Sequence, residues 1–331
     1  MKNTSNTRRF LTGLWAAMTA VLLSVPAAAE PIDNIVFFGD SLSDTGNVSL
    51  TTGGEVPGPQ YNQGSNGRSP DFTAGQWSDP GGPSWPSVFA SMFGLSATPS
   101  IAGGNNYAWG GARTGINETP LGPLWLDQQV SQYASTGPSP TGGTLASIMI
   151  GGNDVASIFD DPAEPEAVIT NGVTSVTTQI ANLYGLGVRQ FLIANVPDIG
   201  STPLFQQLDE GVPGIAAAAS LLTSRWNNAL YAALSGLMLP DVDLRFLDLY
   251  GLGKDPELLA LFANTMDACL TETSVCDDPS SYFFWDEFHP TSTSHALIAD
   301  AAFAAVPEPG TLALLTLGLG GLAFARRRRT N

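Results

Sequence analysis

Two short segments at opposite ends of the chain carry residue types that could perform nucleophilic catalysis. Near the N-terminus, the apolar run 35–38 leads directly into Gly39-Asp40-Ser41. An apolar run that is bounded by turn residues is typical of a buried strand. In open α/β sheets, ligands bind where such strands end. We therefore expect Ser41 to follow a strand and to be a candidate nucleophile, which would need a base, an orienting acid and oxyanion donors.

Histidine is the usual general base for a serine nucleophile, and the chain contains two histidines. His289 lies in a turn-like stretch, three residues after Asp286 and directly before Pro290. Asp286 could orient one ring nitrogen of His289 and leave the other nitrogen to accept the proton of Ser41. His295 falls within the last predicted helix, and we interpret it as a structural residue of that helix. The residues thus predict a relay of Ser41, His289 and Asp286.

Segments of strand character alternate with segments of helix character between these two sites. This alternation favours a mostly parallel sheet with helices on both faces, so we expect a single three-layer α/β/α domain. The polar, Gly- and Pro-rich stretch 47–83 shows no periodicity and is interpreted as surface loops. Strands are predicted at 35–38, 104–109, 144–150, 190–196 and 243–249, and helices at 84–93, 124–133, 166–184, 214–239, 255–265 and 292–305.

The N-terminal residues 1–29 have the pattern of a secretory signal peptide. Lys2, Arg8 and Arg9 precede an apolar run at 10–25, and Ala27-Ala28-Ala29 provides small residues for cleavage before the next residue. The alternative, an N-terminal membrane anchor, is disfavoured because the run is short for a span of about 20 residues. No basic flank follows it.

The C-terminal segment 306–331 combines Val306-Pro307-Glu308-Pro309, a short apolar run at 311–325 and four arginines at 326–329. A plain tail anchor is one interpretation of this pattern. The order of the parts resembles the PEP-CTERM sorting signal of Gram-negative bacteria. That resemblance implies export across the inner membrane, processing by an exosortase, and delivery to the cell surface or extracellular matrix. Contact with the membrane would then occur only through this segment, before processing.

The body between these segments is strongly acidic. The whole chain has a net charge of −17, and seven of its 13 basic residues lie in the two terminal segments. Nucleic acid is therefore excluded as an expected partner, because binding it requires a basic face. Cys269 and Cys276 are the only cysteines, and in an exported chain their spacing most simply predicts a local disulfide, with free thiols as the alternative. No metal-ligand spacing is present, so we expect no metal site.

Four motifs in order resemble the GDSL family of lipolytic enzymes, also called SGNH hydrolases. They are the segment 38–47 with its Gly-Asp-Ser-Leu, Gly110-Gly111-Ala112, Gly151-Gly152-Asn153-Asp154, and Asp286-x-x-His289-Pro290-Thr291. The resemblance covers residues 35 to about 305, and we assign 30–305 to this domain. It implies a flavodoxin-like α/β/α fold. The pentapeptide G-x-S-x-G of α/β-hydrolases does not occur in the chain, which disfavours that fold.

The resemblance also implies roles for individual residues. Ser41 would be the nucleophile, His289 the general base and Asp286 the residue that orients it. The oxyanion hole would consist of the backbone N–H groups of Ser41 and Gly111 and the side-chain amide of Asn153. The implied activity is that of a secreted esterase or lipase that acts on carboxylic esters, in a lipid or an acylated carbohydrate, without a cofactor.

Two other functions remain compatible with the sequence. Some relatives pass the acyl group to an alcohol, so the protein could be an acyltransferase. The sorting segment is also compatible with a non-catalytic surface or matrix protein that reuses the fold for binding. The ester product of an acceptor alcohol would reveal the first, and failure of an active-site probe to label Ser41 would favour the second.

Overall fold

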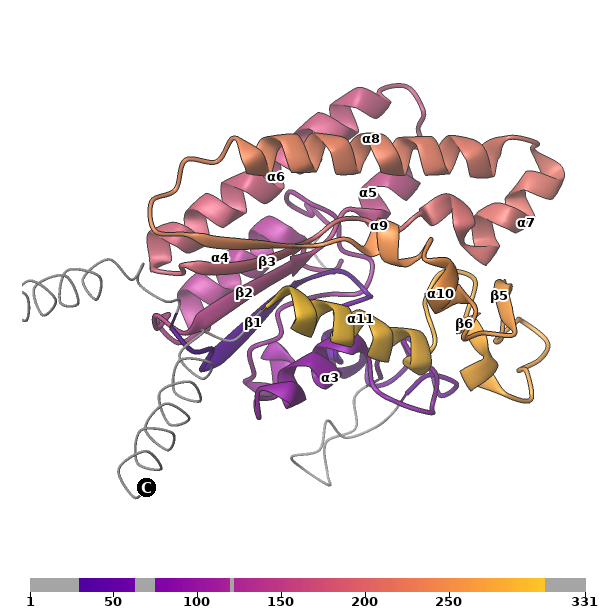
Figure 1. Ribbon diagram of the computed structural model, residues 1–331, viewed down its shortest axis with the longest axis horizontal. Helices are drawn as coiled ribbons and strands as arrows, with labels where there is room; N and C mark the ends of the chain where they lie inside the picture. Colours follow the sequence, from indigo (N-terminus) through magenta and orange to yellow (C-terminus); the bar gives the residue numbers. More distant parts are fainter. Residues whose placement is uncertain (1–29, 63–74, 120–121, 307–331) are drawn as a thin grey trace, which may run out of the picture. The chain divides into compact units, whose positions relative to one another are not determined.

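Four parallel strands form the centre of the protein. The computed structural model describes residues 30–62, 75–119 and 122–306 (Figure 1). The strands β1 (Asn34–Gly39), β2 (Thr144–Met149), β3 (Gln190–Ala194) and β4 (Asp243–Leu247) pair in the order β1-β2-β3-β4. Every residue of β2 and β3 is buried, as expected for strands covered on both faces.

The segment 105–109 extends this sheet beyond β1. The backbone N–H of Tyr107 donates to the carbonyl of Phe37 at 2.8 Å, and that of Trp109 donates to Gly39 at 3.1 Å. The segment precedes β2 in the chain but lies on the other side of β1. Counted with it, the strand order is 2-1-3-4-5, which is the flavodoxin-like order with a ligand site expected between the first and third strands. The predicted fold class is confirmed.

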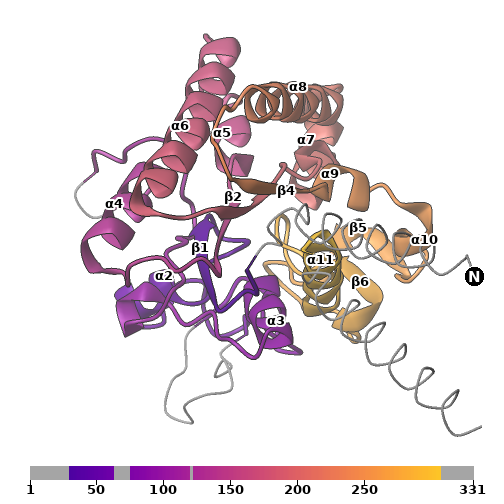
Figure 2. The ribbon, with the colours of Figure 1, turned by 60° about the vertical axis from the view of Figure 1, so that its left-hand side comes forward.

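Helices cover both faces of the sheet (Figures 1 and 2). Alternate side chains of β1 enter two separate cores: Val36 and Phe38 pack in one, and Ile35 and Phe37 pack in the other. The first core takes residues from α4 (Leu126–Thr136), α6 (Pro165–Leu186) and α8 (Ile215–Ser235), and the second from α3 (Trp85–Met92) and α11 (Ser292–Ala305). Because successive side chains of a strand point to opposite faces of the sheet, β1 packs against the helices on both sides.

Several shorter elements connect the strands and the long helices. They are α2 (Asn47–Thr51), α5 (Gly152–Ser157), α7 (Pro203–Gly211), α9 (Leu249–Leu252), α10 (Pro256–Leu259) and three 3₁₀ turns at Ser100–Ala102, Ile199–Ser201 and Pro279–Ser281. The prediction of one helix at 255–265 is wrong. After one turn of α10, the chain forms β5 (Asn264–Ala268), which pairs in parallel with β6 (Tyr282–Phe284).

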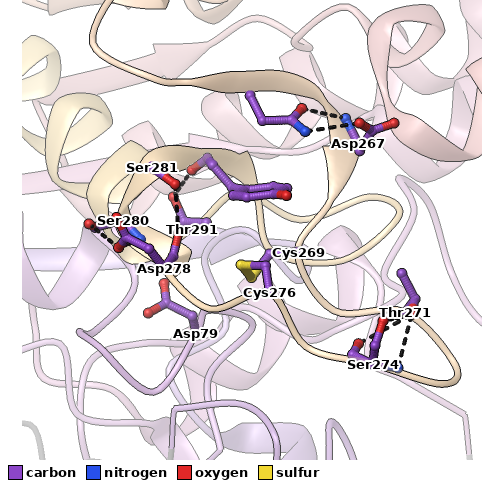
Figure 3. The surroundings of a disulfide bond; sticks show 12 residues. Asp79, Asp267, Cys269, Thr271, Ser274, Cys276, Asp278, Ser280, Ser281 and Thr291 are labelled. Carbon is purple, nitrogen blue, oxygen red and sulfur yellow. Dashed lines mark hydrogen bonds between the residues drawn. A yellow bond between two sulfur atoms is a disulfide. The ribbon is translucent and has the colours of Figure 1, made fainter.

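The predicted disulfide joins Cys269 to Cys276 and closes the loop between β5 and β6 (Figure 3). The backbone N–H of Cys269 donates to the carbonyl of Phe284, and the N–H of Leu270 donates to that of Trp285. The bridge thus fixes the loop against the strand that leads to Asp286. We call the part of the chain from 264 to 284 the β5–β6 lobe.

Both predicted targeting segments, 1–29 and nearly all of 306–331, lie outside the described residues. From Ile32 onward, the described residues belong to one compact unit. Within them, no helix combines the length and the apolar character that crossing a membrane requires.

Candidate active site

Ser41 lies directly beyond the carboxyl end of β1. The end of this strand is held by Gln129 of α4, whose side-chain amide accepts from the N–H of Gly39 at 2.9 Å and donates to its carbonyl at 2.8 Å. A Cβ atom at Gly39 would lie 2.2 Å from the carbonyl oxygen of Met149, so the close approach of β1 and β2 requires glycine here. A tight turn then follows, in which the carbonyl of Asp40 accepts from the N–H groups of two later residues.

The side chains of Ser41, His289 and Asp286 form one chain of hydrogen bonds. Ser41 Oγ lies 2.8 Å from His289 Nε2, and His289 Nδ1 lies 2.7 Å from Asp286 Oδ2. All three residues are buried, with 8% of each exposed. Ser41 and His289 are 248 positions apart in the sequence, and the fold brings them into direct contact.

Asp286 is held as an anion. Its burial alone would raise the pKa of the carboxyl group. The charge of His289 and hydrogen bonds from His289 and Tyr61 outweigh burial and lower that pKa to about 2. An ionised carboxylate only accepts hydrogen bonds, so Nδ1 of His289 carries the proton that lies between them. Nε2 of His289 is then the nitrogen that can accept the hydroxyl proton of Ser41.

A compact turn between β6 and α11 positions the acid and the base. The N–H of Trp285 donates to the carbonyl of His289 at 2.7 Å. Oδ1 of Asp286 accepts from the N–H groups of Phe288 at 2.7 Å and His289 at 2.6 Å. Thr291 then caps α11 through its side chain. The backbone of this turn is hydrogen-bonded to Asp286, and Asp286 in turn orients the imidazole of His289. The turn therefore fixes the position of the ring.

The predicted oxyanion donors lie at the ends of adjacent strands. Gly111 follows the segment 105–109 and has φ +76°, a conformation that favours glycine. The neighbouring N–H of Gly110 donates to Asp44 Oδ2 at 2.9 Å. Asn153 follows β2, and one of its amide N–H groups donates to the carbonyl of Ala112 at 2.8 Å. The bond from Asn153 to Ala112 joins the loops that carry Asn153 and Gly111. Among the described contacts, the second amide N–H of Asn153 has no acceptor.

Two buried carboxyl groups shape these loops. Asp44 also accepts from the N–H groups of Gly46 and Asn47, where α2 begins. Asp40 accepts from the N–H of Leu42 at 3.0 Å, and burial raises the pKa of its carboxyl group to about 7. Neither carboxyl group is bonded to His289 in the described contacts.

A cavity of about 190 Å³ lies beside Ser41 and Asn153. It extends over the carboxyl ends of β2, β3 and β4 to the β5–β6 lobe and α11. Most of its walls are apolar, with contributions from Met149, Val196, Leu252, Leu258, Phe288 and Leu297. Within the described ranges, no group of three or more His, Cys, Asp or Glu side chains is placed to hold a metal ion.

Two aromatic residues in the predicted surface loops belong to the site. Tyr61 Oη donates to Asp286 Oδ2 at 2.7 Å, and the ring of Trp77 lies 4.8 Å from that of His289 between centroids. The only sequence signal for them was an aromatic side chain within a polar, glycine-rich stretch. His295 lies on α11 as predicted but is fully buried, and its Nε2 is bonded to the carbonyl of Trp77 at 3.1 Å.

A serine, a histidine and an ionised carboxylate in series at the carboxyl edge of a parallel sheet form the arrangement that serine hydrolases use. The family model described as GDSL-like lipase/acylhydrolase matches residues 35–302. The chain belongs to this family, and the protein is a hydrolase that acts on ester bonds. The PEP-CTERM protein-sorting motif matches residues 305–329, which indicates export and surface association in a Gram-negative bacterium.

Individual relatives are distant. Lipase 1 of Photorhabdus luminescens is 28% identical over 240 residues, which are 72% of this chain and 32% of that protein. The match thus spans about a third of the length of lipase 1. A GDSL esterase/lipase of Arabidopsis thaliana is 27% identical over 349 residues, which cover 92% of this chain and 97% of the relative. Among solved structures, a catalytic mutant of an acetylxylan esterase from Geobacillus stearothermophilus is 12% identical, covers 85% of this chain and 97% of its own, and has a TM-score of 0.45.

Proposed function

We propose that this protein is an exported serine esterase that hydrolyses carboxylic esters through an acyl-enzyme on Ser41. The observation that carries the proposal is the unbroken series of hydrogen bonds from Ser41 Oγ through His289 to Asp286. A serine hydroxyl is a weak nucleophile until an adjacent base accepts its proton. In this site the base is already within hydrogen-bond distance and is already oriented.

The reaction would proceed in two steps. His289 takes the hydroxyl proton as Ser41 Oγ attacks the acyl carbonyl, and it returns this proton to the departing alcohol oxygen. The N–H groups of Ser41 and Gly111 and the amide of Asn153 would stabilise the negative oxygen of each tetrahedral intermediate. Water that is deprotonated by His289 then attacks the acyl-enzyme, and His289 returns this proton to Ser41 Oγ as the acid leaves.

The apolar cavity beside Ser41 would hold the acyl chain of the ester. Apolar walls favour a hydrocarbon chain because burying each methylene contributes about 0.8 kcal/mol. The substrates would thus be acyl esters of a lipid or a carbohydrate. For localisation, residues 1–29 would direct the chain across the inner membrane and be removed. An exosortase would then process segment 306–331.

The test compares Ser41→Ala, His289→Ala and Asp286→Asn with wild type on p-nitrophenyl esters. Loss of Ser41 or His289 should lower kcat by roughly 10⁴-fold or more, and Asp286→Asn by about 10⁴-fold because it favours the wrong histidine tautomer. Ser131→Ala, on the exposed side of α4, should leave kcat unchanged. Wild-type turnover by Ser41→Ala would reject the mechanism. Ester products in the presence of glycerol or a sterol, in place of free acid, would instead indicate a transferase.

A further inference from the structure

The phenol of Tyr61 and the imidazole of His289 donate to the same oxygen of Asp286. Tyr61 Oη lies 2.7 Å from Oδ2, and His289 Nδ1 lies 2.7 Å from it. We propose that Tyr61 is a fourth, positioning member of the relay, which fixes the carboxylate of Asp286 so that it can orient His289. The proposal rests on the proposed function, since it assigns Tyr61 a role in the same relay.

The hydrogen bonds to Asp286 explain why a residue from a distant segment is needed. A carboxylate offers about four acceptor sites, and Asp286 receives four bonds from the described residues. Three come from its own turn: the N–H groups of Phe288 and His289 to Oδ1, and Nδ1 of His289 to Oδ2. The fourth comes from Tyr61, which lies 225 residues earlier in the chain. Tyr61 is therefore the donor that ties the acid of the turn to the rest of the domain.

The fourth bond also matches the electrostatic needs of the site. A buried carboxylate is costly unless its oxygens accept hydrogen bonds, and only 8% of Asp286 is exposed. The phenol of Tyr61 keeps its proton, because burial and the neighbouring charge of Asp286 raise its pKa. Tyr61 thus remains a donor over the whole range in which an esterase works, and it favours the ionised form of Asp286.

Tyr61 is itself held in place from several sides. Its ring meets Trp77 and Trp285 edge-on, at centroid distances of 5.9 and 6.3 Å. The next residue, Asn62, donates its N–H to the carbonyl of Ser78 and accepts from the N–H of Gln76. The two loop segments that carry Tyr61 and Trp77 are therefore joined, and together they contact both the acid and the base. A phenol placed by chance on an exposed loop would lack this support.

The role predicts a specific kinetic change on removal of the hydroxyl group. Without the bond from Tyr61, the carboxylate of Asp286 is free to rotate away from Nδ1, and its proton affinity rises. The imidazole then loses orientation in the transition state. Tyr61 does not line the cavity beside Ser41, so we expect little effect on binding of the acyl chain. We expect the effect in kcat and little change in KM.

The experiment uses Tyr61→Phe in the full chain, because phenylalanine keeps the ring packing and removes only the hydroxyl group. Losing one hydrogen bond to a charged group should lower kcat roughly tenfold. It should also slow labelling of Ser41 by a fluorophosphonate by a similar factor. Without the hydrogen bond from Tyr61, the carboxylate of Asp286 attracts the proton on Nδ1 of His289 more strongly and favours the protonated imidazole. The acid limb of the kcat/KM profile should therefore move to higher pH. Tyr133→Phe, a buried tyrosine of α4 outside the site, is the matched control and should change none of these.

A double-mutant cycle separates this role from a purely structural one. In an Asp286→Asn background, Tyr61→Phe should have little further effect on kcat, because the anion that it positions is gone. Additive losses, or an unchanged kcat and pH profile in Tyr61→Phe, would overturn the proposal. Neither result would touch the proposed function. That proposal fails if Ser41→Ala keeps wild-type turnover, if the wild type hydrolyses no ester, or if the acyl group passes to an added alcohol in place of water.

Discussion

The indole ring of Trp77 lies over the imidazole ring of His289, with centroids 4.8 Å apart and planes inclined by 33°. Gly110 contacts the same indole from the loop that carries the proposed oxyanion donor Gly111. A Cβ atom at Gly110 would lie 2.6 Å from Cζ2 of the ring. One aromatic side chain therefore touches both the general base and the oxyanion loop of the proposed mechanism.

Replacing Trp77 by alanine should lower kcat about tenfold. The ring face supports the imidazole, and it would stabilise the imidazolium of the transition state by roughly 0.5–2 kcal/mol as a cation–π contact. Trp77→Phe keeps a ring face and should recover part of the loss. Steady-state kinetics on a short-chain ester measure both variants, and a Trp77→Ala enzyme with wild-type kcat would refute the contact's importance.

Adding a methyl group at Gly110 should push the indole away from His289. The nearest indole atoms would lie 2.6–2.8 Å from the new Cβ, which is closer than non-bonded carbons approach. Gly110→Ala should thus lose activity, as Trp77→Ala does. The smaller ring in Gly110→Ala/Trp77→Phe should relieve the overlap and restore activity above that of Gly110→Ala alone. A double variant that is worse than both single variants would contradict this explanation.

Sequence patterns predicted the sheet and the residues at its edge for a simple physical reason. Buried parallel strands are apolar runs that end in turn residues, so the positions of Ser41 and Asn153 follow from local sequence. The turn with Asp286 and His289 is equally local. Their catalytic roles stay predictions, but their proximity follows from the fold.

The contributions of Tyr61 and Trp77 could not be predicted in this way. They lie in a stretch without periodicity, and their partners are in a turn more than 200 residues later. The β5–β6 lobe was missed for a related reason. The apolar spacing of 255–265 suits a helix, but α10 ends at Leu259, and pairing of Asn264 with Tyr282 draws the end of this range into a strand. Tertiary pairing overrides local preference in such segments.

His295 should make the protein less stable as the pH falls. It is fully buried, and burial lowers its pKa to about 4 from an ordinary value of 6.5. Between these two values the unfolded chain binds a proton that the folded protein does not bind, so stability falls as the pH falls through this window. The difference amounts to about 3 kcal/mol. His295→Gln removes the titrating group and should show a flatter decrease from pH 6.5 to 4 in urea unfolding. Parallel curves for the two proteins would contradict the assignment.

Asp40 should act in the opposite direction. Burial raises its pKa to about 7 from an ordinary value of 3.8, so between these values the folded protein binds a proton that the unfolded chain has lost. Stability therefore falls as the pH rises through this window. The decrease amounts to a few kcal/mol, because a difference of one in pKa corresponds to about 1.4 kcal/mol. Asp40→Asn keeps an oxygen acceptor for the N–H of Leu42 and cannot ionise. It should match wild type near pH 4 and exceed it in unfolding free energy at pH 8. A variant that is equally or less stable at pH 8 would refute the prediction.

Filling the cavity should discriminate between acyl chains by length. Leu258 of α10 is half-buried and lines the cavity, whereas Leu261 lies three residues later, is 64% exposed and does not line it. If the acyl chain occupies the cavity, kcat/KM of the wild type should rise from acetyl toward octanoyl esters, since each buried methylene contributes about 0.8 kcal/mol. Leu258→Trp should lower kcat/KM for the octanoyl ester roughly tenfold or more and leave the acetyl ester within about threefold. Leu261→Trp should change neither substrate. Equal losses on both esters in Leu258→Trp would show that the acyl chain lies elsewhere.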